Sequence, residues 1–252
     1  MKFVQVTDLH IVPRGRKLLD LNPIERLSAC IADINQRCEN ASFCVFTGDL
    51  ADGGDPEAYS VLRECLVDLE LPYHLMLGNH DRRASFYEIF PDAPRDENGF
   101  LQFQLATEVG QLIFLDTLDE GRSAGVYCEK RRQWLTQRLQ EANSEPVYLF
   151  MHHPPFDIGI PSLDNIKLDG TEAFAAVLQG SADIRHLFLG HVHLPVSGSW
   201  RGIPFSALPG TNHQIALDFE TVSPMPYDHG PSAYAIVHVD AEQTIVHTKL
   251  QM

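Results

Sequence analysis

Several short apolar runs in this sequence are each followed at once by Asp, Asn or His. The side chains at these positions that can ligate a metal ion are Asp8, His10, Asp49, Asn79, His152, His191 and His193. All of them offer oxygen or nitrogen and none offers a thiolate, which suits Mn(II), Fe, Co(II) or Zn(II) without choosing among them. Seven such groups exceed the needs of one four- or five-coordinate ion, but they suffice for two ions if one carboxylate is shared. The pattern therefore predicts a site for two divalent cations.

The local spacing of these residues supports the same interpretation. Asp8 and His10 stand two residues apart, as do His191 and His193. In an extended chain, side chains at this spacing point to one side and can share a metal ion. Each residue alone has an ordinary alternative, as a loop acid, a turn residue, a helix cap or a buried histidine, so the joint arrangement carries the prediction. Glycines that let the backbone turn sharply after a strand stand beside three of the stretches, at Gly48, Gly78 and Gly190.

The elements that must position these side chains follow from hydrophobic patterning. Five β-rich apolar runs end where the polar residues begin, and in open α/β sheets that carboxyl edge is where ligands bind. These expected strands are Phe3–Val6, Phe43–Phe46, Tyr73–Leu77, Val147–Phe150 and Ile184–Leu189. Helices are expected between them at Pro23–Arg37, Pro56–Leu69, Lys130–Ala142 and Thr171–Leu178, with Asn22 capping the first. A further strand pair, Phe100–Leu105 and Gln111–Asp116, is joined at Gly110. This alternation predicts a layered α/β architecture.

The pattern changes to strands with short turns after Gly190. The expected strands are Val196–Trp200, Ile203–Ala207, Gln214–Phe219, Tyr234–Val239 and Thr244–Thr248. Such a sheet-rich part can close the fold or mediate self-association. The sequence contains no convincing linker, so we expect one α/β domain over residues 1–252 with a sheet-rich C-terminal part, in which residues 196–252 are candidates for an oligomer interface.

Composition narrows the partners and the compartment. The net charge is −15, with 19 Lys and Arg against 34 Asp and Glu, which disfavours a polynucleotide substrate. Five cysteines without any C-x-x-C pair indicate free thiols in a reducing compartment. The N-terminus does not resemble a signal peptide, and no apolar stretch is long enough to span a membrane. We therefore expect a cytoplasmic protein without nucleic-acid or membrane partners.

The order of these motifs resembles the calcineurin-like metallophosphoesterase superfamily, over residues 8–193. The closest resemblance is to class III cyclic nucleotide phosphodiesterases and bacterial glycerophosphodiesterases. The run Gly48–Asp52 and the histidine-histidine-proline-proline run His152–Pro155 are usual in that branch, and Pro209–Gln214 is similar to its glycerophosphodiesterase members. The resemblance implies the metallophosphoesterase fold, a layered β-sandwich flanked by helices, and it implies homo-oligomerisation.

The resemblance also implies individual roles. Asp8, His10 and His193 would bind the first metal ion, Asn79, His152 and His191 the second, and Asp49 would bridge the two. His152 is preferred over His153 because the family's ligand stands two residues before a proline. His80 would lie near the substrate phosphate with Asn79 and protonate or stabilise the leaving alkoxide. Asp81 would orient His80 or a ligand, unless it caps a helix. His213 would approach the substrate or serve the structure.

These features predict a two-metal phosphodiesterase that acts on small phosphate diesters, with glycerophosphodiesters such as glycerophosphocholine or glycerophosphoethanolamine placed first. A 3′,5′-cyclic nucleotide is the alternative. It needs an aromatic platform for its base, and the candidates Tyr227, Phe219 and Trp200 are expected to be core or interface residues instead. A phosphomonoesterase is less favoured, because Gly48–Gly54 lacks the arginine of protein phosphatases. A metal-free scaffold is disfavoured because the whole set of candidate ligands is present.

Overall fold

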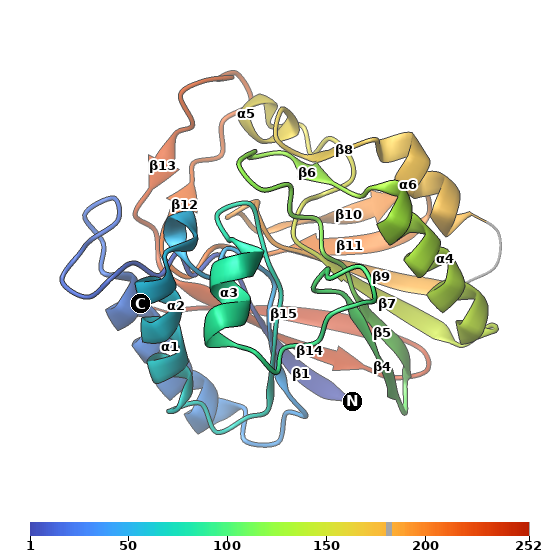
Figure 1. Cartoon of the computed structure of the whole chain (residues 1–252), viewed down its shortest axis with the longest axis horizontal. Coiled ribbons are helices and arrows are strands. Elements are labelled where there is room, and N and C mark those ends of the chain that lie inside the picture. The colour runs from blue at the N-terminus through green and yellow to red at the C-terminus, as the bar shows by residue number, and fades with distance from the viewer. Residues whose placement is uncertain (180–182, 252) are drawn as a thin grey trace.

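Two β-sheets pack face to face, and helices cover the outer face of each (Figure 1). The structure, a computed structural model, describes residues 1–179 and 183–251. The first sheet has the strand order β15-β14-β1-β2-β3, and the second has the order β10-β11-β9-β7-β5-β4. The strands of the first are β1 (Lys2–Val6), β2 (Cys44–Phe46), β3 (Tyr73–Leu75), β14 (Ala233–Val239) and β15 (Thr244–Leu250). Those of the second are β4 (Phe103–Thr107), β5 (Gly110–Phe114), β7 (Pro146–Met151), β9 (Asp183–Leu189), β10 (Val196–Trp200) and β11 (Ile203–Ala207).

The helices divide between the two outer faces. Apolar side chains of α1, α2 and α3 pack on the first sheet, while those of α4 and α6 pack on the second. The helices are α1 (Pro23–Arg37), α2 (Pro56–Leu66), α3 (Arg83–Ile89), α4 (Glu129–Ala142), α5 (Pro161–Asp164) and α6 (Thr171–Leu178), with a 3-10 turn η1 at Asp52–Gly54. The side chain of Asn22 accepts a hydrogen bond from Ile24 N, as expected of the N-cap of α1. The layered sandwich flanked by helices is therefore confirmed.

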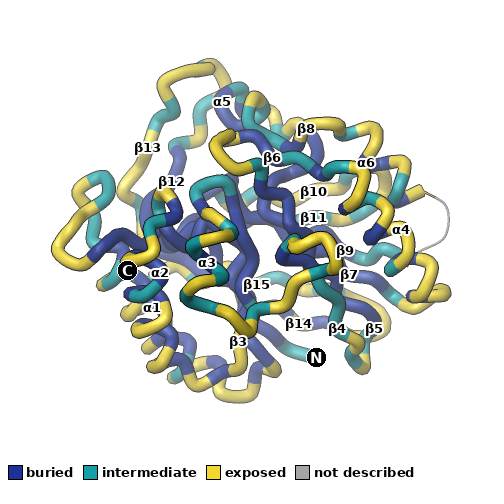
Figure 2. The backbone as a smooth tube through the Cα atoms, in the orientation of Figure 1, coloured by how far each residue is buried: buried dark blue, intermediate teal, exposed yellow. Residues whose placement is uncertain are grey.

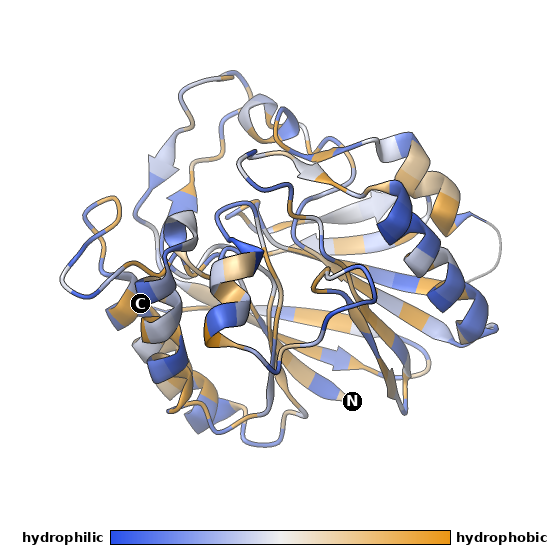
Figure 3. Ribbon diagram, viewed as in Figure 1, coloured by the Kyte–Doolittle hydropathy of each residue, from blue (hydrophilic) through white to orange (hydrophobic). Residues whose placement is uncertain are grey.

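An aromatic layer fills the space between the sheets. Phe150 stacks on Phe114 with ring centroids 4.6 Å apart, and on Phe188 at 4.7 Å. Phe3 of the opposite sheet meets the edges of Phe150 and Phe188. Figure 2 shows the buried strands inside the more exposed helices, and Figure 3 shows apolar residues concentrated in the same strands. This rigid interior fixes where the strands end.

The parallel strands bring their carboxyl ends to one edge of the sandwich. β1, β2 and β3 run parallel in the first sheet, and β5, β7 and β9 run parallel in the second. The loops that leave β1, β2, β3, β7 and β9 therefore start next to one another. These are the five stretches in which the candidate ligands were found.

The C-terminal part is built into both sheets. β11 pairs with β9, and β14 pairs antiparallel with β1, so these strands close the fold. Arg26 of α1 also donates hydrogen bonds to the carbonyl oxygens of Thr211 and Gly230. Self-association through residues 196–252 stays a prediction. Within residues 1–179 and 183–251, no helix combines the length and the apolarity that crossing a membrane requires.

Some expected elements differ from the structure. The helix from Pro56 ends at Leu66 rather than Leu69, and the strand from Tyr73 ends at Leu75 rather than Leu77. The expected strand Gln214–Phe219 is wrong beyond its first two residues, because the Asp218 side chain accepts hydrogen bonds from the backbone of Glu220 and Thr221 and turns the chain. Three short strands were not expected: β6 (Gly125–Val126) and β8 (Leu168–Asp169), which pair with each other, and β13 (Tyr227–Asp228), which pairs with β12 (Gln214–Ile215).

Candidate metal centre

The loops after β1 and β2 lie against each other beyond the ends of their strands. Asp8 N donates to Gly48 O at 3.1 Å, and His10 N donates to Asp49 O at 2.9 Å. The ligand residues here are not extended, because φ is +55° at Asp8, +47° at His10 and +51° at Asp49. His191 and His193 share this left-handed backbone. The expectation that extended backbone aligns the paired side chains is therefore wrong. Asp8 and His10 nevertheless share one group of ligand atoms, whereas His191 and His193 belong to two different groups.

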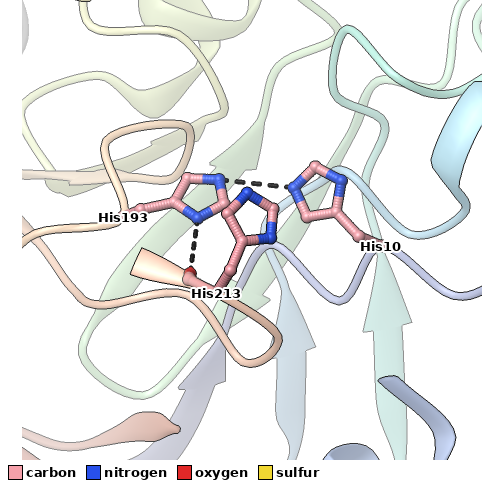
Figure 4. A group of neighbouring side chains, drawn as sticks. All are labelled: His10, His193 and His213. Atoms are coloured by element: carbon pink, nitrogen blue, oxygen red, sulfur yellow. Dashed lines mark hydrogen bonds between the residues drawn. The ribbon is translucent and has the colours of Figure 1, made fainter. Parts of the chain in front are cut away.

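One cluster of ligand atoms joins Asp8, His10, Asp49 and His193, which all lie within 4.8 Å of one another. His193 Nε2 is 3.3 Å from Asp8 Oδ1, and His10 Nε2 is 3.6 Å from Asp49 Oδ2. The Nε2 atoms of His10 and His193 face each other at 3.3 Å (Figure 4). Two ring nitrogens and two carboxylates that converge in this way provide the donor set of a cation site.

The second cluster lies on the other side of Asp49. His152 Nε2 is 3.4 Å from Asp49 Oδ2 and 3.3 Å from Asn79 Oδ1. The ring of His191 lies 5.1 Å from that of His152, and its Nε2 is buried without a hydrogen-bond partner among the described residues. Asp49 Oδ2 therefore stands between His10 and His152, within 3.6 Å of a nitrogen in each cluster.

His153 lies close to the second cluster without facing Asp49 as His152 does. Its Nδ1 is hydrogen-bonded to Thr117 Oγ1 at 2.7 Å, and its ring lies 4.6 Å from that of His191. Its Nε2 also has no partner in the part of the chain that the structure describes. His153 belongs to the geometric group of His152 and His191, so its nitrogen is within reach of a cation bound there.

Backbone carbonyl oxygens orient two of the histidines. His152 Nδ1 donates to Thr47 O at 2.8 Å, and His193 Nδ1 donates to His213 O at 2.8 Å (Figure 4). A carbonyl oxygen only accepts, so each Nδ1 carries a proton and Nε2 is the nitrogen that faces the site and can ligate once it is deprotonated. This arrangement is typical of histidines that ligate metals. Together with the partnerless His191 Nε2, it shows that the residues fit divalent cations.

Glycine is required where the backbone passes behind the ligands. A Cβ at Gly78 would lie 2.2 Å from Asp49 Oδ1, and one at Gly48 would lie 2.4 Å from His152 Nδ1. A Cβ at Gly210 would lie 2.7 Å from His193 Nδ1. Gly210 lies in the run Pro209–Gln214 that carries part of the family resemblance, but the sequence assigns this glycine no role, because its loop reaches the site only through the tertiary fold.

Charges within the clusters balance one another. Burial would raise the pKa of Asp49, but His152, His80 and His10 around it hold this pKa well below its usual range. Burial opposes protonation of His152, yet Asp49 and Asp8 raise the pKa of His152 to about 9. His193 has a raised pKa beside Asp8, against its own burial. His191 instead has a pKa lowered to about 3 by burial and by His152. The buried carboxylates therefore attract positive charge, as protons or as metal ions.

His80 is held by Asp52, which the sequence analysis did not single out. His80 Nδ1 lies 2.8 Å from Asp52 Oδ1, and the same oxygen is 3.5 Å from His10 Nδ1. Burial by itself would lower the pKa of His80, but Asp49 and Asp52 raise this pKa to about 9. The signal for Asp52 was present in the run Gly48–Asp52, although nothing in the spacing assigned a partner to its carboxylate.

The side chain of Asp81 holds the loop that follows Asp49, and it makes no hydrogen bond to His80 among the described residues. Its carboxylate accepts hydrogen bonds from the backbone N–H groups of Leu50, Ala51 and Gly78 and from the hydroxyl of Tyr59. Of the roles expected for Asp81, orienting a ligand fits these contacts. Orienting His80 is the role of Asp52, and α3 begins after Arg82, so Asp81 is not a helix cap.

A cavity of about 170 Å³ opens directly onto the clusters. His10, Asp49, His191 and His193 form its floor with Asn79 and His80, and His213 lines it as well. Six further lining residues form an apolar outer wall, Leu18, Leu19, Ile166, Ile215, Met225 and Tyr227, and the polar residues Asp52 and Ser123 complete the lining. Tyr227 was expected in a core or an interface, but it is 52% exposed at this cavity, next to the ring of His213. Phe219 and Trp200 do not line the cavity.

Comparisons with known proteins agree with this geometry. Residues 1–195 match the family model of calcineurin-like phosphoesterases. A probable cyclic nucleotide phosphodiesterase of Rhodopseudomonas palustris is 43% identical, over 98% of this chain and 91% of its own length. A probable glycerophosphodiester phosphodiesterase of Arcobacter nitrofigilis is 32% identical, over 86% of this chain and 81% of its own. A dimetal phosphatase structure from Danio rerio superposes with a TM-score of 0.75 at 14% identity, covering 99% of this chain and 96% of that one.

The position of Asp49 between the clusters predicts that its charge is needed for full metal loading. Asp49→Asn keeps an oxygen that can accept from His80 N, which lies 2.8 Å from Asp49 Oδ1. Asparagine also tolerates left-handed backbone. We expect metal content, measured by elemental analysis, to fall from two ions per chain to one or fewer. Glu108→Gln, an acid-to-amide change at a side chain that is 77% exposed, should retain both ions. Two ions in Asp49→Asn would contradict the bridge.

Metal affinity should rise with pH. In protein stripped of metal, His152 (pKa about 9) carries an extra proton at neutral pH, and the raised pKa of His193 beside Asp8 also favours its protonated form; such protons must leave before Nε2 can ligate. Binding of Mn(II) or Zn(II) is therefore expected to release about one to two protons per chain near neutral pH. Calorimetric titrations in buffers of different ionisation enthalpy measure this number. A dissociation constant for the metal that stays the same from roughly pH 6.5 to 8.5 would contradict the displacement of protons by the metal.

Proposed function

The chain belongs to the calcineurin-like phosphoesterase family, and from that membership and its site we propose that it hydrolyses small phosphate diesters with two bound metal ions. The relatives reported above are named as phosphodiesterases. The observation that carries the proposal is the position of Asp49, with one carboxylate oxygen between two histidine clusters on the floor of a cavity. The partner of this site is a small-molecule diester. We retain homo-oligomerisation as a proposal based on family resemblance.

We assign the ligands to the two ions as the family resemblance implies. Asp8, His10 and His193 would hold the first ion, Asn79, His152 and His191 the second, and Asp49 both. Two cations at such a site supply a water nucleophile at neutral pH and polarise the phosphoryl oxygens. Mn(II), Fe, Co(II) and Zn(II) all suit this donor set.

The cavity over the ligands favours a diester over a monoester. Among the described residues, no Lys or Arg lines this cavity. A phosphomonoester is a dianion near neutral pH, and its binding sites commonly use Arg for bidentate contacts. A diester carries one negative charge, which the cations themselves can balance. The apolar wall then contacts the alcohol group of the ester.

His80 is the proposed proton donor for the leaving oxygen. With its pKa raised to about 9, it is protonated at neutral pH. Its side chain is 41% exposed and lines the cavity, and Asp52 holds its Nδ1. The Nε2–H is therefore the group that can reach a departing alkoxide or steady a phosphoryl oxygen.

Of the two substrate classes, we now place cyclic nucleotides before glycerophosphodiesters, which reverses the order favoured by the sequence. The outer wall of the cavity is formed by apolar side chains and the ring of Tyr227, so glycerol hydroxyls would find few partners there. A nucleobase can instead stack on the exposed aromatic ring. The relative with 43% identity carries a cyclic nucleotide name, whereas the glycerophosphodiester relative has 32% identity.

The acid role of His80 predicts a dependence on the leaving group. His80→Gln should retain both metal ions and lose about 10²–10⁴ in kcat on cyclic AMP, whose alkoxide is a poor leaving group. The loss on bis(p-nitrophenyl) phosphate should be small, because p-nitrophenolate leaves without a proton. Asp52→Asn should also reduce kcat more on cyclic AMP than on bis(p-nitrophenyl) phosphate, but by a smaller factor than His80→Gln. Equal losses on both substrates would remove the acid role from His80.

Substrate class is tested by comparative kinetics of the metal-loaded protein. We expect kcat/KM to be higher for cyclic AMP than for glycerophosphocholine, and higher for bis(p-nitrophenyl) phosphate than for p-nitrophenyl phosphate. Tyr227→Ala should reduce kcat/KM for cyclic AMP by about tenfold, because a stacked base contributes roughly 1–3 kcal/mol. Phe219→Ala is the matched control, since Phe219 is 65% exposed but lies outside the cavity. A higher kcat/KM for glycerophosphocholine would place glycerophosphodiesters before cyclic nucleotides. A higher kcat/KM for p-nitrophenyl phosphate, the monoester, would overturn the diesterase proposal.

A further inference from the structure

A second cavity, of about 230 Å³, adjoins the metal centre on the far side of His80. Asn79, His80 and Ser123 line both cavities, so the two hollows meet at the position expected for the phosphate. The first cavity contains the metal ligands and the apolar wall. The second shares Asn79 with the first but has no apolar wall, and its other lining residues are Gly53, Asp81, Arg82, Gly121 and Arg122. The carboxylate of Asp81 is occupied by hydrogen bonds from three backbone N–H groups and from the Tyr59 hydroxyl. A phosphate diester has two alcohol groups, and two cavities with different linings, one largely apolar and one with arginines, meet at this position.

Arg82 is the arginine of the second cavity that has no acidic partner among the described residues. Within them its guanidinium makes no hydrogen bond and no ion pair, while its backbone N–H donates to the Tyr59 hydroxyl and its carbonyl oxygen accepts from Phe86 N. Arg122 differs, because it pairs with Asp119 at 2.9 Å and with Asp169 at 2.8 Å. Arg122 thus contributes little net charge, and Arg82 remains able to bind an anion.

The backbone is shaped to hold Arg82 in this place. Gly54 has φ of +65°, and a Cβ there would lie 2.4 Å from Cγ of Arg82 and 2.9 Å from its Cδ. The aliphatic stem of Arg82 therefore packs directly on the glycine backbone of η1. Arg82 as a whole is exposed, so its stem lies along the protein surface while the guanidinium stays accessible to solvent and to a ligand.

We propose that the second cavity is a subsite for a negatively charged ester arm, and that the protein also hydrolyses open-chain diesters in which one alcohol group is apolar or aromatic and the other carries a carboxylate or a phosphate. This inference rests on the proposed diesterase function and extends it, because a cyclic nucleotide has no separate second arm. The phosphodiester lies at the junction of the cavities, the apolar arm lies against Tyr227 and Met225, and the anionic arm contacts the guanidinium of Arg82.

The reaction on such a substrate is an ordinary hydrolysis. Water adds to phosphorus, the bond from phosphorus to the leaving oxygen breaks, and the leaving alcohol receives one proton. The charged arm takes no part in the bonds that form or break. Arg82 therefore acts on specificity, through binding, and its effect belongs in kcat/KM for charged substrates.

Two isosteric substrates test the subsite. Butyl p-nitrophenyl phosphate and 3-carboxypropyl p-nitrophenyl phosphate share the leaving group and the arm length, and they differ in one carboxylate. For the metal-loaded protein we expect kcat/KM to be about fivefold higher for the carboxylate, the size expected of one partly solvated charged contact. This preference would oppose the net charge of −15, which by itself repels the more anionic substrate.

Variants of Arg82 identify the source of the preference. In Arg82→Gln the ratio of the two kcat/KM values should fall to one or below, while turnover of the butyl ester is retained. In Arg82→Glu the ratio should invert, and p-nitrophenyl phosphorylcholine should become a better substrate than the butyl ester. Arg185→Gln is the control, because it removes one positive charge from a partly exposed arginine that pairs with Asp183, outside both cavities. Its ratio should match that of the unaltered protein.

The outcomes separate the two proposals. If the unaltered protein hydrolyses both esters at a ratio of one or less, or if Arg82→Gln leaves the ratio unchanged, the anionic subsite is overturned and the diesterase function stands. If the metal-loaded protein hydrolyses neither ester, the diesterase function is overturned, and so is the subsite proposal that rests on it.

Discussion

Two buried carboxylates, Asp8 and Asp49, define the constraint on which the rest of this structure depends. Both are almost completely inaccessible to solvent, and the charged side chains that oppose them are histidines rather than Lys or Arg. A buried negative charge requires a positive partner close by. Protons on His152 and His193 can supply it, and so can divalent cations. The same atoms would therefore serve both states, so that metal ions could take the place of these protons.

This arrangement is demanding for the backbone. Five of the expected ligands adopt left-handed backbone, which is uncommon for any residue other than glycine. Each such residue costs on the order of 1 kcal/mol or more, and it persists only where the surroundings determine it. The surroundings here are the stacked phenyl rings of Phe114, Phe150 and Phe188 and the parallel strands on which they stand. The rigid sandwich stabilises the strained loops, and the loops supply the chemistry.

The sequence predicted most of the centre because its signals are local. A strand, a glycine and a polar side chain stand together at Gly48, Gly78 and Gly190, so the strand edges and the candidate ligands could be found without the fold. Asp52 and Tyr227 were missed or misplaced because their roles depend on contacts across the tertiary structure. Asp52 meets His80 from another loop, and Tyr227 reaches the cavity only because β13 pairs with β12. The turn formed by Asp218 replaced an apolar strand pattern for a similar reason, since one side-chain oxygen competed with pairing.

The place of β1 in its sheet has a consequence for biosynthesis. β1 lies between β2 and β14, and the loop that follows it receives a hydrogen bond at Thr7 O from Thr211 N. During translation, one side of β1 stays without its partner until β14 (Ala233–Val239) has been made. Long-range pairing of this kind folds slowly and exposes an open strand edge in the meantime. The first sheet should therefore be completed late, and until then the free edge of β1 is a place where two partly folded chains can pair.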